Sequence, residues 1–422
     1  MIELRDRIIS QKQVYSDGSK LFQNPIYVIM VKKAVRAGLV GSGFAARFHY
    51  EALQRVYSAK VDVVGVYSAT AEKRAAFAAE RAVPAFDTLD ALLQNCDVVH
   101  VCTPPATHEP IVTAALQKGK DVIVEKPLTG YFGDGSAQFN GDAFPREDGL
   151  LHALKSIKRM LDAEEKSTAK IMYAENWIYA PAIQKEREIL EKTGAQILWM
   201  HGEQSHSGSH SLAYGQWHLS GGGSLMGKGC HPLAVALYFK QVEGRTRNGQ
   251  PIRPKSISAR THAITRMPQY KNEGYLQTTY KDIEDFALLH IEFEDGTIAT
   301  LTASELVLGG VNNWIEVNTS NHRTRCQMSG NDAMKTYTPA GRHYKDVYVV
   351  EKGETKEGWS FISPDEGWFH GYQHEMNAFY KSITEGAPVE SNSRLAADTI
   401  ATIYAGYVSA ERNGAAVPVT LL

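Results

Sequence analysis

The sequence has little of what extracellular and membrane-bound proteins rely on. It contains only four cysteines, Cys96, Cys102, Cys230 and Cys326, and none stands in C-x-x-C spacing. Neither a zinc knuckle nor a disulfide framework is therefore indicated. No apolar run approaches the length that crosses a bilayer, and the first seven residues are charged where a secretory signal would be apolar. We expect a cytoplasmic protein without a membrane partner.

Strong charge of either sign is also absent. The 45 basic and 47 acidic residues give a formal net charge of -2, which offers no reason to expect nucleic acid as a partner. The hydrophobic content of 43% and charged content of 22% are ordinary for a globular protein. A chain of 422 residues is long enough for two domains, each with its own core.

A glycine-rich motif follows the first strong apolar run, at residues 34–40. It reads G-x-G-x-x-A, with Gly41, Gly43 and Ala46 at the fixed positions, and a helix-like stretch follows. Gly41 permits a tight turn, Gly43 lets the backbone approach a pyrophosphate, and Ala46 lets the helix pack closely on the strand. The free N–H groups at the helix start then suit phosphate. Because strand and helix flank the motif, we favour a dinucleotide site over a plain glycine turn.

Predicted strands and helices alternate after this motif. Strands are expected at 61–67, 98–102 and 121–125, and helices at 71–81 and 108–118. Such alternation predicts a parallel sheet covered on both faces, with ligands bound beyond the carboxyl ends of its strands. The residues at these ends are Gly41, Ser68, Thr103 and Lys126. We therefore expect them to converge on one crevice.

The chain divides into three regions by composition. Residues 1–33 form an N-terminal extension, which either packs on a neighbouring subunit or is a partly ordered tail. Residues 34–175 form the dinucleotide-binding domain, with a Gly- and Asp-rich insertion at 130–149 that is either a lid or a surface loop. Residues 176–422 form a second domain, in which 286–293 and 297–303 predict a hairpin. Helices are predicted at 372–383 and 395–410, followed by a short strand within 416–421.

Several motifs together resemble the Gfo/Idh/MocA family of nicotinamide-dependent oxidoreductases. Besides the glycine motif, they are T-P-P-A-T-H at 103–108, E-K-P-L at 125–128, E-N at 175–176, G-G-G-S-L at 221–225, G-C-H at 229–231, E-D-F at 284–286 and Y-Q-H-E at 372–375. The resemblance runs from about residue 35 to the C-terminus, interrupted by 130–149 and 243–254. It implies an α/β fold: an N-terminal Rossmann domain plus a C-terminal α/β domain with a large open, mostly antiparallel sheet. It also implies C-terminal helices that pack back on the first domain, and a homodimer or homotetramer formed through the sheet.

The resemblance assigns an acid/base pair to Lys126 and His231. Lys126 would hold the substrate hydroxyl and relay its proton if burial lowers the lysine pKa, whereas a lysine after a strand is otherwise solvated. His231 is the second acid/base candidate, with a structural core histidine as the alternative. The other predicted substrate-binding residues are Glu175, Asn176, Tyr179, Trp217 and Lys228. The predicted cofactor-binding residues are Gly41, Gly43, Phe44, Ala45, Ser68, Lys73, Thr103, Pro104, His108, Glu125 and Lys126.

One position departs from the family pattern. Members commonly carry an aspartate four residues before the histidine, where this chain has Gly227, with Lys228 beside it. A lost negative charge and a gained positive one favour an anionic substrate, unless Lys228 is solvated. The histidines at 201, 206, 210 and 218 lack convincing ligand spacing, so we predict no metal site and expect sugar contacts there instead.

Cofactor choice depends on the end of the second strand. An acid there would bind the adenosine ribose and repel a 2′-phosphate. The chain has Tyr67, Ser68 and Ala69, followed by Lys73 and Arg74 on the next helix. No acid opposes a 2′-phosphate, yet no arginine stands at the strand tip to bind one. We predict NAD, and NADP stays open.

Three functions are consistent with these residues. The first is an NAD(P)-dependent oxidoreductase acting on a ring CH–OH of a sugar or polyol. The second is an NAD-dependent glycoside hydrolase, which would oxidise, eliminate, hydrate and reduce again with the cofactor regenerated, acting on an anionic glycoside such as a sulfoquinovoside. The third is a non-catalytic cofactor-binding sensor, against which the retention of both Lys126 and His231 argues.

Overall fold

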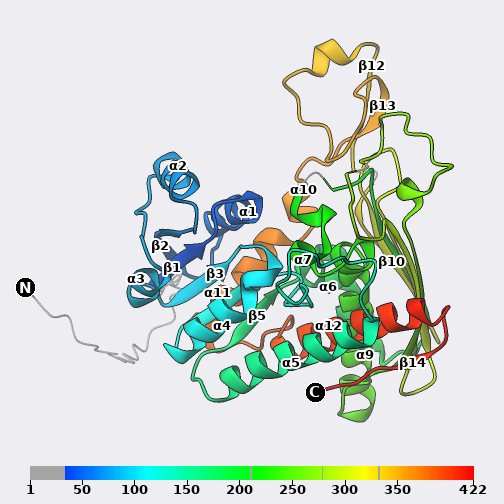
Figure 1. Cartoon of the computed structure of the whole chain (residues 1–422), viewed down its shortest axis with the longest axis horizontal. Coiled ribbons are helices and arrows are strands. Elements are labelled where there is room, and N and C mark those ends of the chain that lie inside the picture. The colour runs from blue at the N-terminus through cyan, green and yellow to red at the C-terminus, as the bar shows by residue number, and fades with distance from the viewer. Residues whose placement is uncertain (1–33, 210–211, 278, 331–332) are drawn as a thin grey trace, which may run out of the picture. The chain divides into compact units, whose positions relative to one another are not determined.

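The computed structural model describes residues 34–422 apart from 210, 211, 278, 331 and 332 (Figure 1). The predictions made for residues 1–33 and for His210 therefore lie outside the described residues. None of the described helices is both long and apolar enough to cross a membrane.

The first sheet is the predicted parallel sheet. Its strands are β1 (Ala34–Val40), β2 (Lys60–Tyr67), β3 (Val98–Val101), β4 (Asp121–Glu125) and β5 (Ile171–Ala174), in the order β2-β1-β3-β4-β5. All four pairings are parallel. Every residue of β3 is buried, which agrees with its mostly apolar sequence, Val-Val-His-Val. The helices between the strands are α1 (Phe44–Leu53), α2 (Ala71–Arg81), α3 (Leu89–Asn95), α4 (His108–Gln117) and α5 (Arg146–Glu165).

The insertion ends earlier than predicted. Helix α5 begins at Arg146, so the loop stops at Pro145 rather than at 149. Pro145 precedes the first turn, and Glu147 and Asp148 lie within it, where carboxylates favour a helix N-terminus. Gly149, which we took for a loop residue, lies inside the helix, where a Cβ would stand 2.9 Å from the Phe144 ring.

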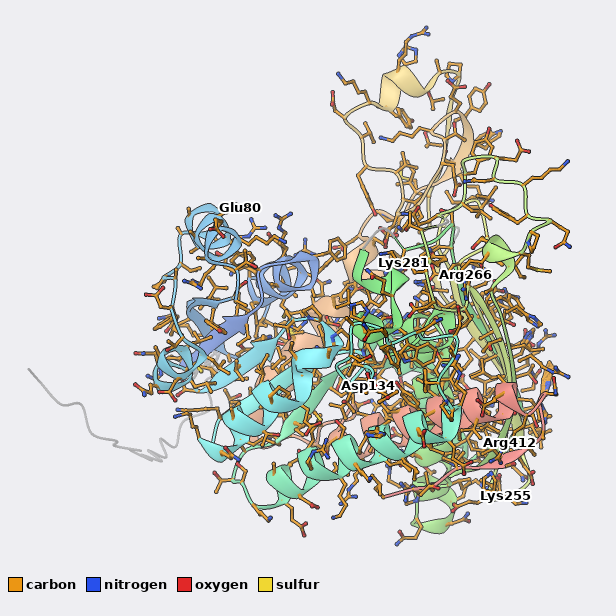
Figure 2. All side chains as sticks on the ribbon, viewed as in Figure 1. Glu80, Asp134, Lys255, Arg266, Lys281 and Arg412 are labelled. Carbon is orange, nitrogen blue, oxygen red and sulfur yellow. The ribbon has the colours of Figure 1, made fainter. Side chains whose placement is uncertain are left out.

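Contacts with the second domain hold the insertion in place. Trp217 Nε1 donates to the carbonyl of Tyr131 at 3.0 Å. Arg266, labelled in Figure 2 together with Asp134 of the insertion, forms an ion pair with Asp142 at 2.6 Å. The Arg146 guanidinium lies 4.3 Å from the centre of the Trp217 ring. These contacts join the insertion to the second domain through aromatic packing and charge.

The second sheet is mostly antiparallel, as predicted. Its order is β11-β10-β6-β9-β8-β7-β14. The strands are β6 (Ile197–Ser205), β7 (Pro254–His262), β8 (Phe286–Phe293), β9 (Ile298–Ser304), β10 (Asn312–Thr319), β11 (Arg323–Ser329) and β14 (Val417–Pro418). The predicted hairpin is present as the antiparallel pair β8–β9, and the one parallel pairing joins β6 to β9.

Helices cover one face of this sheet. They are α6 (Pro181–Thr193), α9 (Cys230–Asn248) and α12 (Ser393–Glu411), which contact β11, β6 and β7 respectively. On the other face Leu198, Trp199 and Leu288 are exposed, and the homodimer or homotetramer expected there stays a prediction. Helix α12 also runs along α5, and α11 (Tyr372–Glu385) packs on α1 (Figure 1). Both C-terminal helices thus contact the Rossmann region.

A small hairpin projects beyond the main sheets. It consists of β12 (Lys335–Thr338) and β13 (Gly358–Phe361), drawn in orange tones in Figure 1. The chain returns from it through the short helix α10 (Glu366–Phe369) to α11. Two further short helices, α7 (Trp217–Ser220) and α8 (Ser224–Gly227), precede α9.

Candidate active site

A cavity of about 590 Å³ opens beside the end of β4 and the start of α1, within the size range of small-molecule sites. Its walls come from α1, β6, β10, the start of α9 and the segment that leads into α11. Of the predicted site residues, those that line it are Phe44, Ala45, Glu125, Lys126, Asn176, Lys228 and His231. The fold therefore brings the predicted acid/base pair into one cavity.

Three predicted substrate residues, Glu175, Tyr179 and Trp217, do not line this cavity. The Tyr179 hydroxyl accepts from the Ser391 backbone at 3.1 Å, and its ring packs on Phe379. Trp217 instead holds the insertion, as described above. None of the described lining residues comes from the insertion, so the insertion does not form a wall of this cavity. Tyr348 and Glu351, which follow the projecting hairpin's first strand, line the cavity instead.

The glycine motif has the geometry of a phosphate cradle. Gly41 has φ +117°, and a Cβ there would lie 2.4 Å from the Cys102 carbonyl oxygen, so no side chain fits. A Cβ on Gly43 would meet no described atom within 4 Å. Within the described part of the chain no side chain caps α1, which leaves its first N–H groups available. An open approach to uncapped helical N–H groups fits a dinucleotide pyrophosphate.

The two glycines provide a matched test of this loop. We expect Gly43→Val to fold like the wild type and to lose NAD binding, because its side chain fills the open approach. Gly41→Val should lose stability, since its side chain would collide with the backbone of β3's end. Circular dichroism melts and NAD titration by intrinsic fluorescence measure both effects. Unchanged NAD affinity in a folded Gly43→Val protein would contradict the assignment.

The other predicted cofactor residues surround this loop. Ser68 is buried and its hydroxyl accepts from Ser42 at 3.0 Å, whereas Lys73 is exposed on α2. His108 is fully buried and bridges two loops, with Nε2 2.9 Å from the Thr103 carbonyl and Nδ1 3.0 Å from the Pro127 carbonyl. His108 thus holds the loop of Thr103 and Pro104 against the E-K-P loop.

An arginine that we placed only on the following helix reaches the tip of β2. Arg74 donates to the Ser68 carbonyl at 2.7 Å and to Asp87 at 2.8 Å. A guanidinium beside the second strand is the group that accommodates a ribose 2′-phosphate. Asp87 neutralises this guanidinium in the structure. Arg74 is therefore placed where a guanidinium could reach a ribose 2′-phosphate.

Lys126 follows β4 directly and is a partly buried cation. Its Nζ donates to the Gly227 carbonyl at 3.2 Å and lies 5.7 Å from the centre of the Tyr214 ring. Burial lowers the pKa of Lys126, but the surrounding groups, Tyr214 and Cys230 ahead of Glu125 and Glu175, more than offset burial and raise that pKa above its ordinary value. The lowered pKa that a base would require is therefore not what this environment gives. Lys126 is suited to donate a hydrogen bond and to stabilise a developing alkoxide.

His231 forms a buried pair with Glu175. Nδ1 lies 2.5 Å from Glu175 Oε1, and the imidazole stacks on Trp177 with ring centres 5.6 Å apart. Burial lowers the pKa of His231, and the Lys126 cation lowers it further, while Glu175 raises it. The net lowering keeps the imidazole neutral near pH 7. A neutral imidazole whose Nδ1 faces a carboxylate can accept a proton at Nε2.

A buried chain of hydrogen bonds supports the E-K-P glutamate. His49 Nε2 lies 3.0 Å from Glu125 Oε1, His49 Nδ1 lies 2.9 Å from His100, and His100 Nε2 lies 3.0 Å from the Tyr380 hydroxyl. Burial raises the pKa of Glu125, but His49 outweighs it and the net shift is downward. Glu125 therefore stays ionised beside Lys126.

Three of the cavity residues that escaped the sequence analysis carry unpartnered polar atoms. Gln204, Asn313 and His370 line the cavity. One buried atom of each side chain, Oε1, Oδ1 and Nε2 respectively, has no hydrogen-bond partner among the described residues. Gln204 and Asn313 face each other across β6 and β10. Burial lowers the pKa of His370 to about 4, so it is neutral. Unpartnered buried polar atoms are rare, and these three suit the hydroxyls of a ligand.

Lys228 is buried rather than solvated, and it has a partner. Its Nζ lies 3.0 Å from Glu305 Oε1 and donates to the Ser209 hydroxyl at 2.8 Å. Both charged side chains are less than a tenth exposed. The family's aspartate is missing at Gly227, but the Glu305 carboxylate balances the charge of Lys228. The sequence-based argument for an anionic substrate, which rested on an unbalanced Lys228, loses its premise.

One group of side chains has atoms close enough to hold a metal ion. Ligand atoms of Glu175, Cys230 and His231 lie within 4.8 Å of one another. Metal binding requires a thiolate and a free imidazole nitrogen. Burial raises the pKa of Cys230 to about 12, and His231 Nδ1 is already paired with Glu175. This donor set fits an acid/base pair better than a metal site.

Two regions of the chain match known family profiles. Residues 35–138 match the Gfo/Idh/MocA oxidoreductase family, NAD-binding Rossmann fold. Residues 189–325 match the Gfo/Idh/MocA C-terminal domain.

Individual relatives agree with these matches. UDP-N-acetylglucosamine 3-dehydrogenase of Acidithiobacillus ferrooxidans is 38% identical over 95 residues, which cover 22% of this chain and 29% of that protein. Inositol 2-dehydrogenase 4 of Saccharopolyspora erythraea is 38% identical over 96 residues, covering 22% and 27%. The chain thus spans less than a third of the length of either relative. The structure of GenD2 from gentamicin A biosynthesis in complex with NAD has a TM-score of 0.73 at 22% identity, over 92% of this chain and 97% of that one. This likeness shows the fold.

Proposed function

The chain belongs to the Gfo/Idh/MocA family of oxidoreductases, and we propose that it transfers a hydride between a ring CH–OH of a neutral sugar or polyol and NAD. The observation that carries this proposal is the pairing, in one cavity, of a cationic Lys126 with a neutral His231 that is bonded to Glu175. A secondary alcohol needs one group to take its proton and another to stabilise the oxygen.

The proposed roles follow from the charge of each group. The bound nicotinamide supplies the hydride acceptor. His231 Nε2 takes the hydroxyl proton, and Glu175 orients the ring and stabilises the imidazolium that results. Lys126 donates to the same oxygen while the carbonyl forms. In the reverse direction the imidazolium returns the proton to the alcohol oxygen.

The unpartnered polar atoms of the cavity suit a polyol. Gln204 Oε1 and Asn313 Oδ1 are acceptors that sugar hydroxyls would satisfy, and neutral His370 Nε2 accepts or donates according to its tautomer. A Gln–Asn pair held by opposite strands also sets a fixed spacing between two hydroxyl contacts. Leaving such buried atoms unpaired costs about 1–3 kcal/mol each.

The charges around the cavity favour a neutral substrate. The described residues that line it include two lysines, Lys126 and Lys228, and three carboxylates, those of Glu125, Glu351 and Glu366. Glu305 already pairs with Lys228. A sulfonate or phosphate on the sugar would add a further negative charge to this surrounding.

NAD is the cofactor that we propose. The Gly43 approach and the α1 N-terminus would hold the pyrophosphate, with Ser68 at the ribose end. The Arg74 guanidinium, which could bind a 2′-phosphate, is paired with Asp87 in the structure. Turnover with NAD and with NADP, measured side by side, tests this choice.

The decisive experiment is a redox stoichiometry. The protein is incubated with NAD or NADP and a panel of free hexoses, inositols, hexose phosphates, nucleotide-linked hexosamines and aryl glycosides, neutral and anionic. We expect one nicotinamide reduced per ketone formed, with neutral sugars or inositols turned over best. Absorbance measures the amount of reduced nicotinamide, and mass spectrometry measures the amount of ketone formed.

Other outcomes would replace the proposal. Release of aglycone with no net reduction would favour the redox glycosidase, and NAD binding without turnover of any compound would favour a sensor. Faster turnover of a phosphorylated or sulfonated sugar than of its neutral counterpart would contradict the neutral substrate.

A further inference from the structure

The projecting hairpin exposes an aromatic face. Tyr337 and Trp359 are paired across β12 and β13, with ring centres 5.6 Å apart, and are 57% and 73% exposed. Phe361, two residues after Trp359 and therefore on the same face, is also exposed, and Lys335 Nζ lies 4.8 Å from the centre of its ring. Large exposed aromatic groups of this kind mark ligand or partner sites rather than ordinary surface.

A second cavity, of about 200 Å³, lies against this hairpin. Trp359 and Phe361 line it, together with the glycine-containing turns before β10 and after β11. Val311 and Glu366 line both this cavity and the active-site cavity. The two cavities are therefore neighbours, separated by the same two side chains.

Two residues that line the second cavity carry polar atoms without partners. Ser363 Oγ and Glu366 Oε1 are buried and have no hydrogen-bond partner in the described part of the chain. The other Glu366 oxygen, Oε2, accepts from the hydroxyl of Tyr348, a residue of the active-site cavity. Glu366 is thus held through Oε2, while its Oε1 has no partner among the described residues.

We propose that this second cavity is a subsite for a second sugar ring, so that the substrate is a glycoside of at least two rings. A pyranose has an apolar C–H face, which suits Trp359 and Phe361, and hydroxyls, which suit Ser363 and Glu366. The reacting ring would lie at Lys126, with the glycosidic oxygen near Glu366 and the distal ring on Trp359. The inference rests on the proposed function for the first ring, and it adds the size of the substrate.

Trp359→Ala tests the subsite. Binding of glucose, maltose and cellobiose is measured by calorimetry in the presence of NAD, and kcat/KM for the same sugars by nicotinamide reduction. We expect maltose or cellobiose to bind the wild type at least tenfold more tightly than glucose. Trp359→Ala should weaken the disaccharide about ten- to a hundredfold, as loss of an aromatic anchor does, mainly through KM, and leave glucose almost unchanged. Ser363→Ala should weaken the disaccharide in the same sense by less.

The control is Tyr275→Ala, which removes an aromatic side chain of similar exposure, 64%, away from both cavities. Equal affinity of the wild type for glucose and both disaccharides, or an equal effect of Trp359→Ala on all three, would overturn the subsite. So would a change of sedimentation mass in Trp359→Ala, because the aromatic face would then bind a second copy of the chain. Failure of the proposed function is distinct: it would be sugar binding without nicotinamide reduction.

Discussion

Replacement of Lys126 by methionine is expected to lower turnover by about two to four orders of magnitude, the range for a group that acts on proton transfer. Methionine keeps most of the buried stem, so the loss reports the ammonium group. Affinity for NAD should change little, because Nζ points to the Gly227 carbonyl on the substrate side. Stopped-flow turnover and NAD titration separate the two quantities.

The same variant should change the pH profile in a defined direction. The Lys126 cation is one of the groups that lower the pKa of His231. Without that cation the imidazolium is less disfavoured, so the pKa rises. Oxidation needs neutral His231, and the acid limb of the residual kcat/KM should therefore move to higher pH. Lys155→Met on the exposed face of α5 serves as the control. Turnover near the wild-type value, or an acid limb that moves to lower pH, would contradict the role of Lys126.

Much of the cofactor-binding part of the site could be predicted, because its residues stand in motifs that are local in the sequence. Buried parallel strands are mostly apolar and can be recognised in the sequence. Their carboxyl ends lie on one edge of the sheet. Gly41 and Lys126 could therefore be placed together without knowing the fold of the second domain. Helix α2 was predicted at its observed bounds, Ala71–Arg81. The end of the insertion was misjudged, because Gly149 looks like a loop residue until its packing on Phe144 is known.

The substrate side could not be predicted in the same way. Gln204 and Asn313 meet only through the register of β6 and β10, which are distant in sequence. Lys228 looked like an unbalanced charge because its partner, Glu305, lies just beyond β9. Trp217 and Tyr179 have side chains typical of sugar contacts, yet in the fold Trp217 binds the insertion and Tyr179 packs on Phe379. A polar residue at a strand position that faces the core was the signal in the sequence by which Gln204 and Asn313 could have been found.

Replacement of His231 by glutamine is expected to lower turnover by about two to four orders of magnitude as well. Glutamine retains an N–H that can donate to Glu175, so the buried carboxylate is not left without a partner. Removing the partner of a buried charge costs about 3–5 kcal/mol, which would confuse a loss of activity with a loss of folding. His218→Gln, at an exposed position, is the matched control. A His231→Gln protein with wild-type melting temperature and near-normal turnover would assign the proton to another group.

Glu175→Gln completes the argument, because it should move the acid limb opposite to Lys126→Met. Glu175 raises the pKa of His231, so its neutral replacement should lower that pKa and move the acid limb to lower pH. Turnover should also fall, since a glutamine does not stabilise the imidazolium, but by less than in His231→Gln, where the base itself is lost. A merely structural Glu175 would reduce activity without moving the pH profile. Opposite shifts in the two variants would identify His231 as the titrating base between a cation and a carboxylate, whereas shifts of the same sign, or none, would place the titrating group elsewhere.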